Sequence, residues 1–360
     1  ADQQSVKDQV GESSIGLGYR VPLVIASPWS RGGWVNSQVF DLTSSLQFLE
    51  KFLSYKTGKK IEEPNVSAWR RTVCGDLTSA FRPYNGEKLN KPEFLNKKEF
   101  IESIHKAQFR NPPSNYKRLS KDEITKINKT PRSSPQLASQ EQGIRSSCAL
   151  PYRLFVDGNI SRDKQSFDIR FRSSNPEASM DKIQWAGSPF QVYAPGIYQN
   201  EAMKAWDYAV AAYEELTDKW QISGFEKGFY HLRVHGPNGF YCEFKGDRND
   251  PPVRISYDYP YNLGKQPTGE FSIFYGNEDA GEYIISIHDN AYKRKDRTFT
   301  LTPNKTRNGT GSAVFNLDTS YGWYDFTVKI KDHPGFERRY AGRVETGKPG
   351  KTDPFMGRVI

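Results

Sequence analysis

The chain has 360 residues, of which 36% are hydrophobic and 14% aromatic, and this composition is sufficient for a hydrophobic core. The sequence contains no apolar run long enough to span a membrane. It carries 51 Lys and Arg against 42 Asp and Glu, a net charge of +9, and residues 82–132 hold 13 of the basic and 6 of the acidic residues. No RNP pattern, zinc-ligand spacing or helix-turn-helix accompanies this stretch, so a solvated loop or an anionic lipid surface is favoured over nucleic acid.

The first predicted element is a strand over Val21–Ala26. This apolar run is continuous rather than alternating, which is typical of a strand buried on both faces of a parallel sheet. A helix is predicted from about Leu42 to Tyr55, because its leucines recur on one face. Asp41 is a suitable N-cap, and Gly58 lies just past the expected end.

A single strand of this type cannot satisfy its own backbone or cover its two apolar faces. The next hundred residues contain no comparable strand. We therefore predict that residues 1–145 are the end of an α/β domain whose other strands come from sequence outside this chain or from another chain. Because the first residue is Ala1, we expect a processed chain or a part of a longer one.

Residues 82–145 are rich in Pro, Lys and Asn and should form a basic insertion with short helices. Asn96 with Glu99, and Ser120 with Glu123, have the spacing of a capping box before apolar residues. Each pair therefore predicts a helix start.

From Ala149 onward, apolar and polar residues alternate in short runs separated by turn residues, which is typical of antiparallel sandwiches. An internal repeat supports this fold, because Gly228–Val234 matches Gly322–Val328 and a second matching run follows each copy. The copies lie about 95 residues apart, the size of one sandwich. We predict two all-β antiparallel sandwiches, residues 146–250 and 251–347, with Tyr230 equivalent to Tyr324, and then a tail, residues 348–360.

Cysteine and histidine spacing gives no metal or redox motif. Cys74 and Cys148 could form one disulfide if the protein is exported, and Cys242 is expected to be unpaired. His231 and His235 would lie roughly 13 Å apart along a strand, too far to bind one ion, and are read as surface residues. No catalytic residue and no metal ligand is identified in this chain.

The most suggestive segment is Ser27–Trp34, which follows the predicted strand at the end where open α/β sheets bind their ligands. Arg31 could contact a phosphate, and Trp29 or Trp34 could face a choline-like cation. The alternative is a packed loop whose tryptophans cover the sheet edge, with Arg31 paired to a buried carboxylate such as Asp41.

Several long segments closely resemble the bacterial phosphocholine-preferring phospholipase C family, and the resemblance runs from about Gly16 to Gly357. The segments that carry it are Arg20–Gly33, Val39–Glu50, Ala68–Ser79, Pro113–Tyr116, Ser147–Tyr152, Gly228–Gly246, Gly322–Phe326 and Phe336–Gly347. The chain has Leu42 where the family's Phe-Asp-His-Thr-Ser run carries a histidine, so any polar role of that histidine is absent here.

This resemblance implies a catalytic domain similar to alkaline phosphatase, of which this chain holds the last strand and helix. It also implies hydrolysis of phosphatidylcholine or sphingomyelin to phosphocholine and diacylglycerol or ceramide. The family's nucleophile and divalent-metal motifs precede the segment where this chain begins. We therefore expect an N-terminal catalytic half, in cis or as a separate chain, to hold the metal, and this chain alone to be inactive.

Because the substrate is a lipid, secretion or export to the periplasm is expected. Two other functions stay open: a non-catalytic subunit that binds lipid or a partner, and part of a related acid phosphatase.

Overall fold

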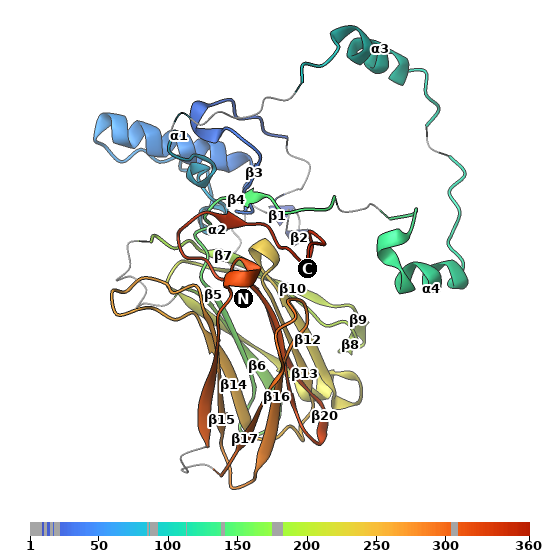
Figure 1. The fold of residues 1–360 in the computed structure, drawn as a ribbon, viewed down its shortest axis with the longest axis vertical. Coiled ribbons are helices and arrows are strands. Elements are labelled where there is room, and N and C mark those ends of the chain that lie inside the picture. Colours follow the sequence, from blue (N-terminus) through green and yellow to red (C-terminus); the bar gives the residue numbers. More distant parts are fainter. Residues whose placement is uncertain are drawn as a thin grey trace.

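The structure is a computed structural model that describes residues 9–10, 13–14, 17, 22–84, 86, 93–112, 114–137, 141–174, 183–303 and 309–360. Most of the described chain forms antiparallel sheets, and the helices belong to its first 133 residues apart from short 3₁₀ turns (Figure 1). The helices are α1 (Leu42–Thr57), α2 (Ala68–Val73), α3 (Lys97–Ala107) and α4 (Lys121–Lys129).

One large antiparallel sheet runs through the body, with strand order β10-β7-β12-β13-β20-β19-β16-β17. Its strands are β7 (Ser188–Tyr193), β10 (Ala205–Val210), β12 (Tyr230–His235), β13 (Tyr241–Gly246), β16 (Tyr283–Asp289), β17 (Arg297–Leu301), β19 (Trp323–Ile330) and β20 (His333–Arg343). Two three-stranded sheets, β11-β6-β5 and β14-β15-β18, complete two sandwich-like halves with it. Their strands are β5 (Leu154–Ile160), β6 (Ser166–Ser173), β11 (Glu215–Gln221), β14 (Val253–Asp258), β15 (Phe271–Asn277) and β18 (Thr310–Phe315).

The predicted internal repeat has the same register in both copies. Tyr230 lies opposite Gly246 in the β12–β13 hairpin, and Tyr324 lies opposite Gly342 in the β19–β20 hairpin. Both tyrosines are fully buried, as are the other apolar positions of the alternating runs. The expected equivalence of the two tyrosines is therefore confirmed.

The two halves are joined through their sheets, which the sequence pattern did not predict. β13 pairs with β20, so that Phe244 lies opposite Arg338 and Cys242 lies opposite Tyr340. By the hairpin registers, Tyr340 and Arg338 are the counterparts of Phe244 and Cys242, so the same pair occurs twice about a pseudo-twofold axis. Side chains of both halves consequently belong to one continuous hydrophobic core.

The strand expected over Val21–Ala26 is not formed. Val21 lies outside the described residues, residues 22–27 have no strand structure, and the side chains of Leu23 and Val24 are 58% and 92% exposed. The physical reason is the lack of a partner strand, because an extended segment is stable only where neighbours accept its backbone hydrogen bonds.

Helix α1 begins and ends where the sequence indicates. Asp41 forms a capping box with Ser44, and Gly58 adopts the left-handed conformation that ends the helix, with φ 68°. Helices α3 and α4 likewise begin after Asn96 and Ser120, as the capping residues predict. Both helices lie on an arm, residues 93–137, that extends away from the sheets (Figure 1).

A small mixed sheet connects the beginning and end of the described chain. In it, β4 (Ser146–Ser147) pairs in parallel with β3 (Trp34–Val35) and antiparallel with β21 (Gly350–Lys351). The expected tail is anchored in this sheet by the Trp323 indole, which donates to the Lys351 carbonyl at 3.0 Å, and beyond it by the Tyr292 hydroxyl, which donates to Asp353 at 3.0 Å. The segment after Ala26 is thereby held against the β-rich body.

Candidate functional site

The Ser27–Trp34 loop is ordered by local hydrogen bonds and by a second loop near residue 82. The Ser27 hydroxyl accepts a hydrogen bond from the Trp29 amide at 3.2 Å, which caps the 3₁₀ turn η2 (Pro28–Ser30). The Arg82 amide donates to the Trp29 carbonyl at 2.8 Å, and its guanidinium donates to the Arg31 carbonyl. The Arg82 guanidinium also lies 4.3 Å from the centre of the Trp34 ring.

The three predicted binding residues differ in how accessible these contacts leave them. The Trp34 ring is covered by Arg82, whereas the Trp29 side chain is 54% exposed. The Arg31 guanidinium lies 5.6 Å from the centre of the Tyr84 ring and makes no ion pair in the part of the chain that the structure describes. Trp29 and Arg31 are therefore available to a ligand at this loop.

The alternative pairing of Arg31 with Asp41 does not occur. Asp41 is buried and accepts hydrogen bonds from the Thr43 amide at 2.8 Å and from the Arg70 guanidinium. Arg70 lies on α2, so this ion pair fixes the start of α1 to the neighbouring helix.

Helix α1 contacts the neighbouring segment, residues 61–81, through polar side chains and through Phe48, whose ring stacks on Phe81. Glu50 accepts from Arg71 at 2.8 Å, Lys51 contacts Asp76 at 2.8 Å, and the Ser54 hydroxyl binds the Ile61 backbone. Another face carries an apolar stripe that this segment leaves uncovered, with exposed fractions of 71% for Leu42, 42% for Leu46, 50% for Leu49, 51% for Phe52 and 38% for Leu53. This arrangement is the reverse of the usual one, in which the apolar stripe faces the core.

A cavity of about 270 Å³ lies where the N-terminal part meets the sheets. It is lined by backbone and side chains around α2 and by Tyr152 and Trp185. The Tyr152 hydroxyl accepts a hydrogen bond from the Val39 amide at 3.1 Å, and burial raises the pKa of Tyr152 above its usual value. Cys74 also lines this cavity and forms no disulfide with Cys148, and the thiols of Cys148 and Cys242 are free in the structure.

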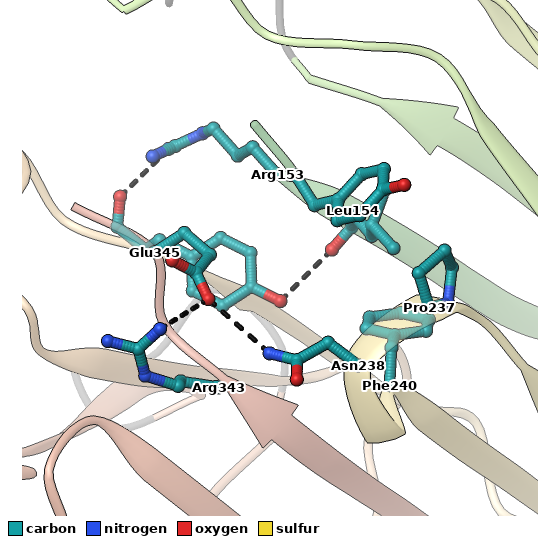
Figure 2. Close-up of a pocket in the computed structure, with 9 residues that line it drawn as sticks. Arg153, Leu154, Pro237, Asn238, Phe240, Arg343 and Glu345 are labelled. Carbon is teal, nitrogen blue, oxygen red and sulfur yellow. Dashed lines mark hydrogen bonds and ion pairs between the residues drawn. The ribbon is translucent and has the colours of Figure 1, made fainter. Parts of the chain in front are cut away.

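A second cavity, near the end of β20, is too small for a substrate. Its volume is about 20 Å³, room for one water molecule. Figure 2 shows the buried carboxylate of Glu345 within reach of Arg343, at 2.7 Å, and of Asn238, at 3.4 Å. Burial raises the pKa of Glu345 to about 7, against the opposing effect of Arg343. We interpret this carboxylate as structural, since it also accepts from the buried Leu150 amide.

Across the described ranges, no three His, Cys, Asp or Glu side chains are grouped so that they could hold a metal ion. His231 instead binds Glu243, with 2.6 Å between Nε2 and Oε1, and Arg233 binds the same oxygen at 3.0 Å. A divalent metal therefore has no donor set among these residues. Nor does any helix among these residues have the length and apolar character needed to cross a membrane.

Sequence reasoning missed Arg82 and the outward stripe of α1. Nothing in the residues around Arg82 indicates that it would contact a loop about fifty positions earlier in the chain. Periodicity predicts the stripe but not its exposure, because it shows only that a helix is amphipathic; the contacts of Glu50 with Arg71 and of Lys51 with Asp76 decide which face meets the neighbouring segment.

Comparison with known proteins gives two matching family models. The description "Bacterial phospholipase C, C-terminal domain" matches residues 146–247 and 251–343, and "Phosphoesterase family" matches residues 1–54. The non-hemolytic phospholipase C of Pseudomonas aeruginosa is 34% identical over 352 residues, which cover 95% of this chain and 44% of that protein.

Two further relatives agree. The non-hemolytic phospholipase C of Burkholderia pseudomallei is 33% identical over 349 residues, and the hemolytic phospholipase C of P. aeruginosa is 31% identical over 369 residues. Each match covers 95% of this chain and 43% or 45% of the relative, so the chain spans less than half the length of these proteins. The chain therefore belongs to the bacterial phospholipase C family.

Proposed function

We propose that this chain is the C-terminal portion of a phospholipase C that hydrolyses choline phospholipids, phosphatidylcholine or sphingomyelin, to phosphocholine and diacylglycerol or ceramide. In this proposal, residues 1–145 complete an alkaline-phosphatase-like catalytic domain, and the two β-rich halves are accessory. A catalytic half with the nucleophile and a divalent metal, in cis or as a separate chain, supplies the chemistry. The metal would offset negative charge on the transferring phosphoryl oxygens.

The observation that carries the proposal is the outward apolar stripe of α1. Five large apolar side chains on one helix face are 38–71% exposed, and Leu23 and Val24 in the preceding segment are exposed as well. An exposed apolar face of this kind marks a surface that another protein part covers. The occupant we infer is the parallel sheet of the catalytic half, because Leu23–Ile25 has the composition of a buried strand.

The loop residues support a substrate role on the same side. Once Leu23–Ile25 joins a sheet, the loop with Trp29 and Arg31 lies at the carboxyl end of that strand, where α/β sheets bind ligands. Arg31 has no carboxylate partner among the described residues and is suited to a lipid phosphate, while the exposed Trp29 ring is suited to the choline cation.

The arm supports contact with a lipid surface. On α3, Phe100, Ile101 and Ile104 are 50–64% exposed, beside Lys97 and Lys98 at the start of the helix. A helix with an apolar face and basic flanks binds at the interface of a membrane that contains anionic lipid. A lipid substrate also favours secretion or export to the periplasm.

The proposal can be tested by joining this chain, in frame, behind the N-terminal half of the P. aeruginosa non-hemolytic phospholipase C. Phosphocholine release from phosphatidylcholine vesicles is then measured for three proteins: the unaltered fusion, Leu49→Glu and Tyr55→Glu. Leu49 lies in the stripe, whereas Tyr55 is 91% exposed and lies outside it. We expect Leu49→Glu to lose most activity and Tyr55→Glu to retain it.

The stripe variant also has a control in the isolated chain. There, Leu49→Glu should leave the melting temperature nearly unchanged, because Leu49 is already half-exposed. A fusion in which Leu49→Glu is as active as the unaltered protein would contradict the proposed docking of α1. A fusion that folds but releases no phosphocholine would contradict the proposed activity.

A further inference from the structure

The two three-stranded sheets leave a cleft between them, on the side of the molecule opposite the outer face of the large sheet. This seam cleft has a volume of about 220 Å³. Residues of β5 and β6 line one wall and residues of β14 and β15 the other, and those that matter here are Asp157, Arg170, Arg172, Arg254, Asp258 and Phe274. The cleft is remote from Arg31 in the fold, since β5 and β14 belong to the sandwich-like halves.

The first wall presents two guanidinium groups held by one carboxylate. Arg170 and Arg172 both contact Asp157, with N–O distances of 3.2 and 3.0 Å. Asp157 is buried, so this contact fixes the position of both arginine side chains. The Arg172 guanidinium also lies 4.8 Å from the centre of the Phe155 ring, and its Nε has no hydrogen-bond partner.

The second wall adds positive charge without a matching carboxylate. Arg254 is exposed at the cleft and makes no hydrogen bond or ion pair with any residue that the structure describes. Asp258 is already bound to Arg153 at 3.1 Å, and the Arg153 side chain is only 3% exposed. Arg153 also donates to the Tyr259 carbonyl at 2.8 Å, and it lines the small cavity near β20 rather than the seam cleft.

The balance of these groups favours an anion. Three guanidinium groups, those of Arg170, Arg172 and Arg254, line the cleft together with two carboxylates. Both carboxylates are already engaged, Asp157 by Arg170 and Arg172, and Asp258 by Arg153, which lies outside the lining. Positive charge that is partly removed from water is costly unless an anion joins it. The groups of Arg172 and Arg254 reach the cleft from two different sheets, which suits an oxyanion with several oxygens pointing in different directions.

The mouth of the cleft is apolar on one side. Phe274 is 43% exposed, and the cleft continues past it into an open hollow over β14, β15 and β18 that also includes Arg254. A ligand that carries an organic group next to its anionic group could therefore pack that group on the Phe274 ring. We propose that the seam cleft binds the phosphate group of an organic phosphate ester, with Arg172 and Arg254 as its donors.

The test measures binding of sn-glycerol 3-phosphate to the 360-residue chain by titration calorimetry, with glycerol as the uncharged control. Arg254→Gln is the main variant, because Arg254 has no partner to strand. Lys329→Gln is the matched control: it removes one positive charge from the outer face of the large sheet, where Lys329 is 60% exposed. We expect saturable binding that Arg254→Gln weakens about tenfold, the scale of one charge-assisted hydrogen bond, and that Lys329→Gln leaves unchanged.

A second experiment identifies the source of the phosphate group. Sedimentation with phosphatidylcholine vesicles that contain phosphatidic acid, with and without glycerol 3-phosphate as competitor, shows whether a lipid headgroup reaches the cleft. Binding of glycerol 3-phosphate without vesicle binding identifies a soluble ester, and vesicle binding that the soluble ester inhibits identifies a lipid. The proposal is overturned if glycerol 3-phosphate does not bind, if both charge variants bind equally, or if a polyglutamate peptide occupies the cleft more tightly than the ester.

Discussion

Arg338 is a buried cation at the junction of the two halves, and its removal is the sharpest test of how they are joined. Its Nη2 donates to the Tyr230 hydroxyl at 2.6 Å and contacts Asp250 at 3.3 Å, and its Nη1 donates to the Lys245 carbonyl at 2.7 Å. The guanidinium also lies 4.1 Å from the centre of the Phe336 ring. Arg338 lies on β20, whereas Tyr230, Lys245 and Asp250 belong to the first half or the turn after it.

The expected loss in the free energy of unfolding on Arg338→Met follows from the buried polar groups that lose their partner. Met fills a similar volume among the aromatic rings, so the packing loss is small. The side chain of Asp250 is 8% exposed and would lose its only cationic partner among the described residues, and the Lys245 carbonyl would lose a donor. Breaking a buried ion pair from one side costs about 3–5 kcal/mol, a large share of a typical stability of about 5–15 kcal/mol.

The neighbouring residue provides the matched control. Arg339 points to the opposite face of β20 and pairs with Asp325 at 2.7 Å, with 35% of its side chain exposed. Arg339→Met should cost about 1 kcal/mol, since solvent screens such a pair. Urea denaturation of both variants, followed by tryptophan fluorescence and far-UV circular dichroism, measures the two losses. Equal losses, or a first half that unfolds unaffected by Arg338→Met, would refute the reasoning that one core spans both halves.

Three further predictions concern charge, the loop and the arm. Burial alone would raise the pKa of Glu243, but hydrogen bonds from His231 and Arg233 lower it well below the usual 4.5, so its ionised form stabilises the fold above pH 4.5 and this contribution is lost as the pH falls below that. Glu243→Gln should therefore flatten the fall in melting temperature between about pH 5.5 and about pH 3.5, one unit either side of the usual value, and an unchanged slope would contradict this. In the fused enzyme, Arg31→Ala should lower kcat/KM, by an amount that corresponds to a loss of about 1.5–3 kcal/mol of transition-state stabilisation, with little change in melting temperature. A fully active but destabilised variant would contradict the proposed substrate role of the loop. Ile104→Asp on α3 should weaken sedimentation with anionic vesicles without changing the melting temperature, and unchanged sedimentation would show that the arm does not contact lipid.

The β-rich halves could be predicted from the sequence because their strands are half-buried. Alternation of apolar and polar residues reports which side chains face the core, and the matching of Gly228–Val234 with Gly322–Val328 set the equivalence of Tyr230 and Tyr324. The joining of β13 to β20 could not be predicted in this way. Edge pairing depends on which backbone edges meet, and the pattern of Cys242 and Phe244 is the same whether or not a strand lies beside them.

In the N-terminal part, the helices could be predicted from the sequence but the strand could not. Caps and periodicity located α1 to within two residues, and they also located the starts of α3 and α4, since these signals are local. The strand over Val21–Ala26 was predicted from composition, yet a strand exists only with partners, and residues 22–27 have none in this structure. The seam cleft was missed because Arg172 and Arg254 lie more than eighty positions apart, in runs where each looks like an ordinary outward-facing residue.

The central claim, that this chain contributes to a phospholipase C without carrying its chemistry, is tested most directly by assaying the chain alone. Release of p-nitrophenol from p-nitrophenyl-phosphorylcholine is followed for the purified 360-residue chain with Zn²⁺, Mg²⁺, Mn²⁺, Ca²⁺ or Fe³⁺, beside the fusion that carries a metal-bearing half. Because no metal-binding group is found among the described residues, we predict turnover by the fusion and none above background by the chain alone. Robust metal-dependent turnover by the chain alone would contradict the account.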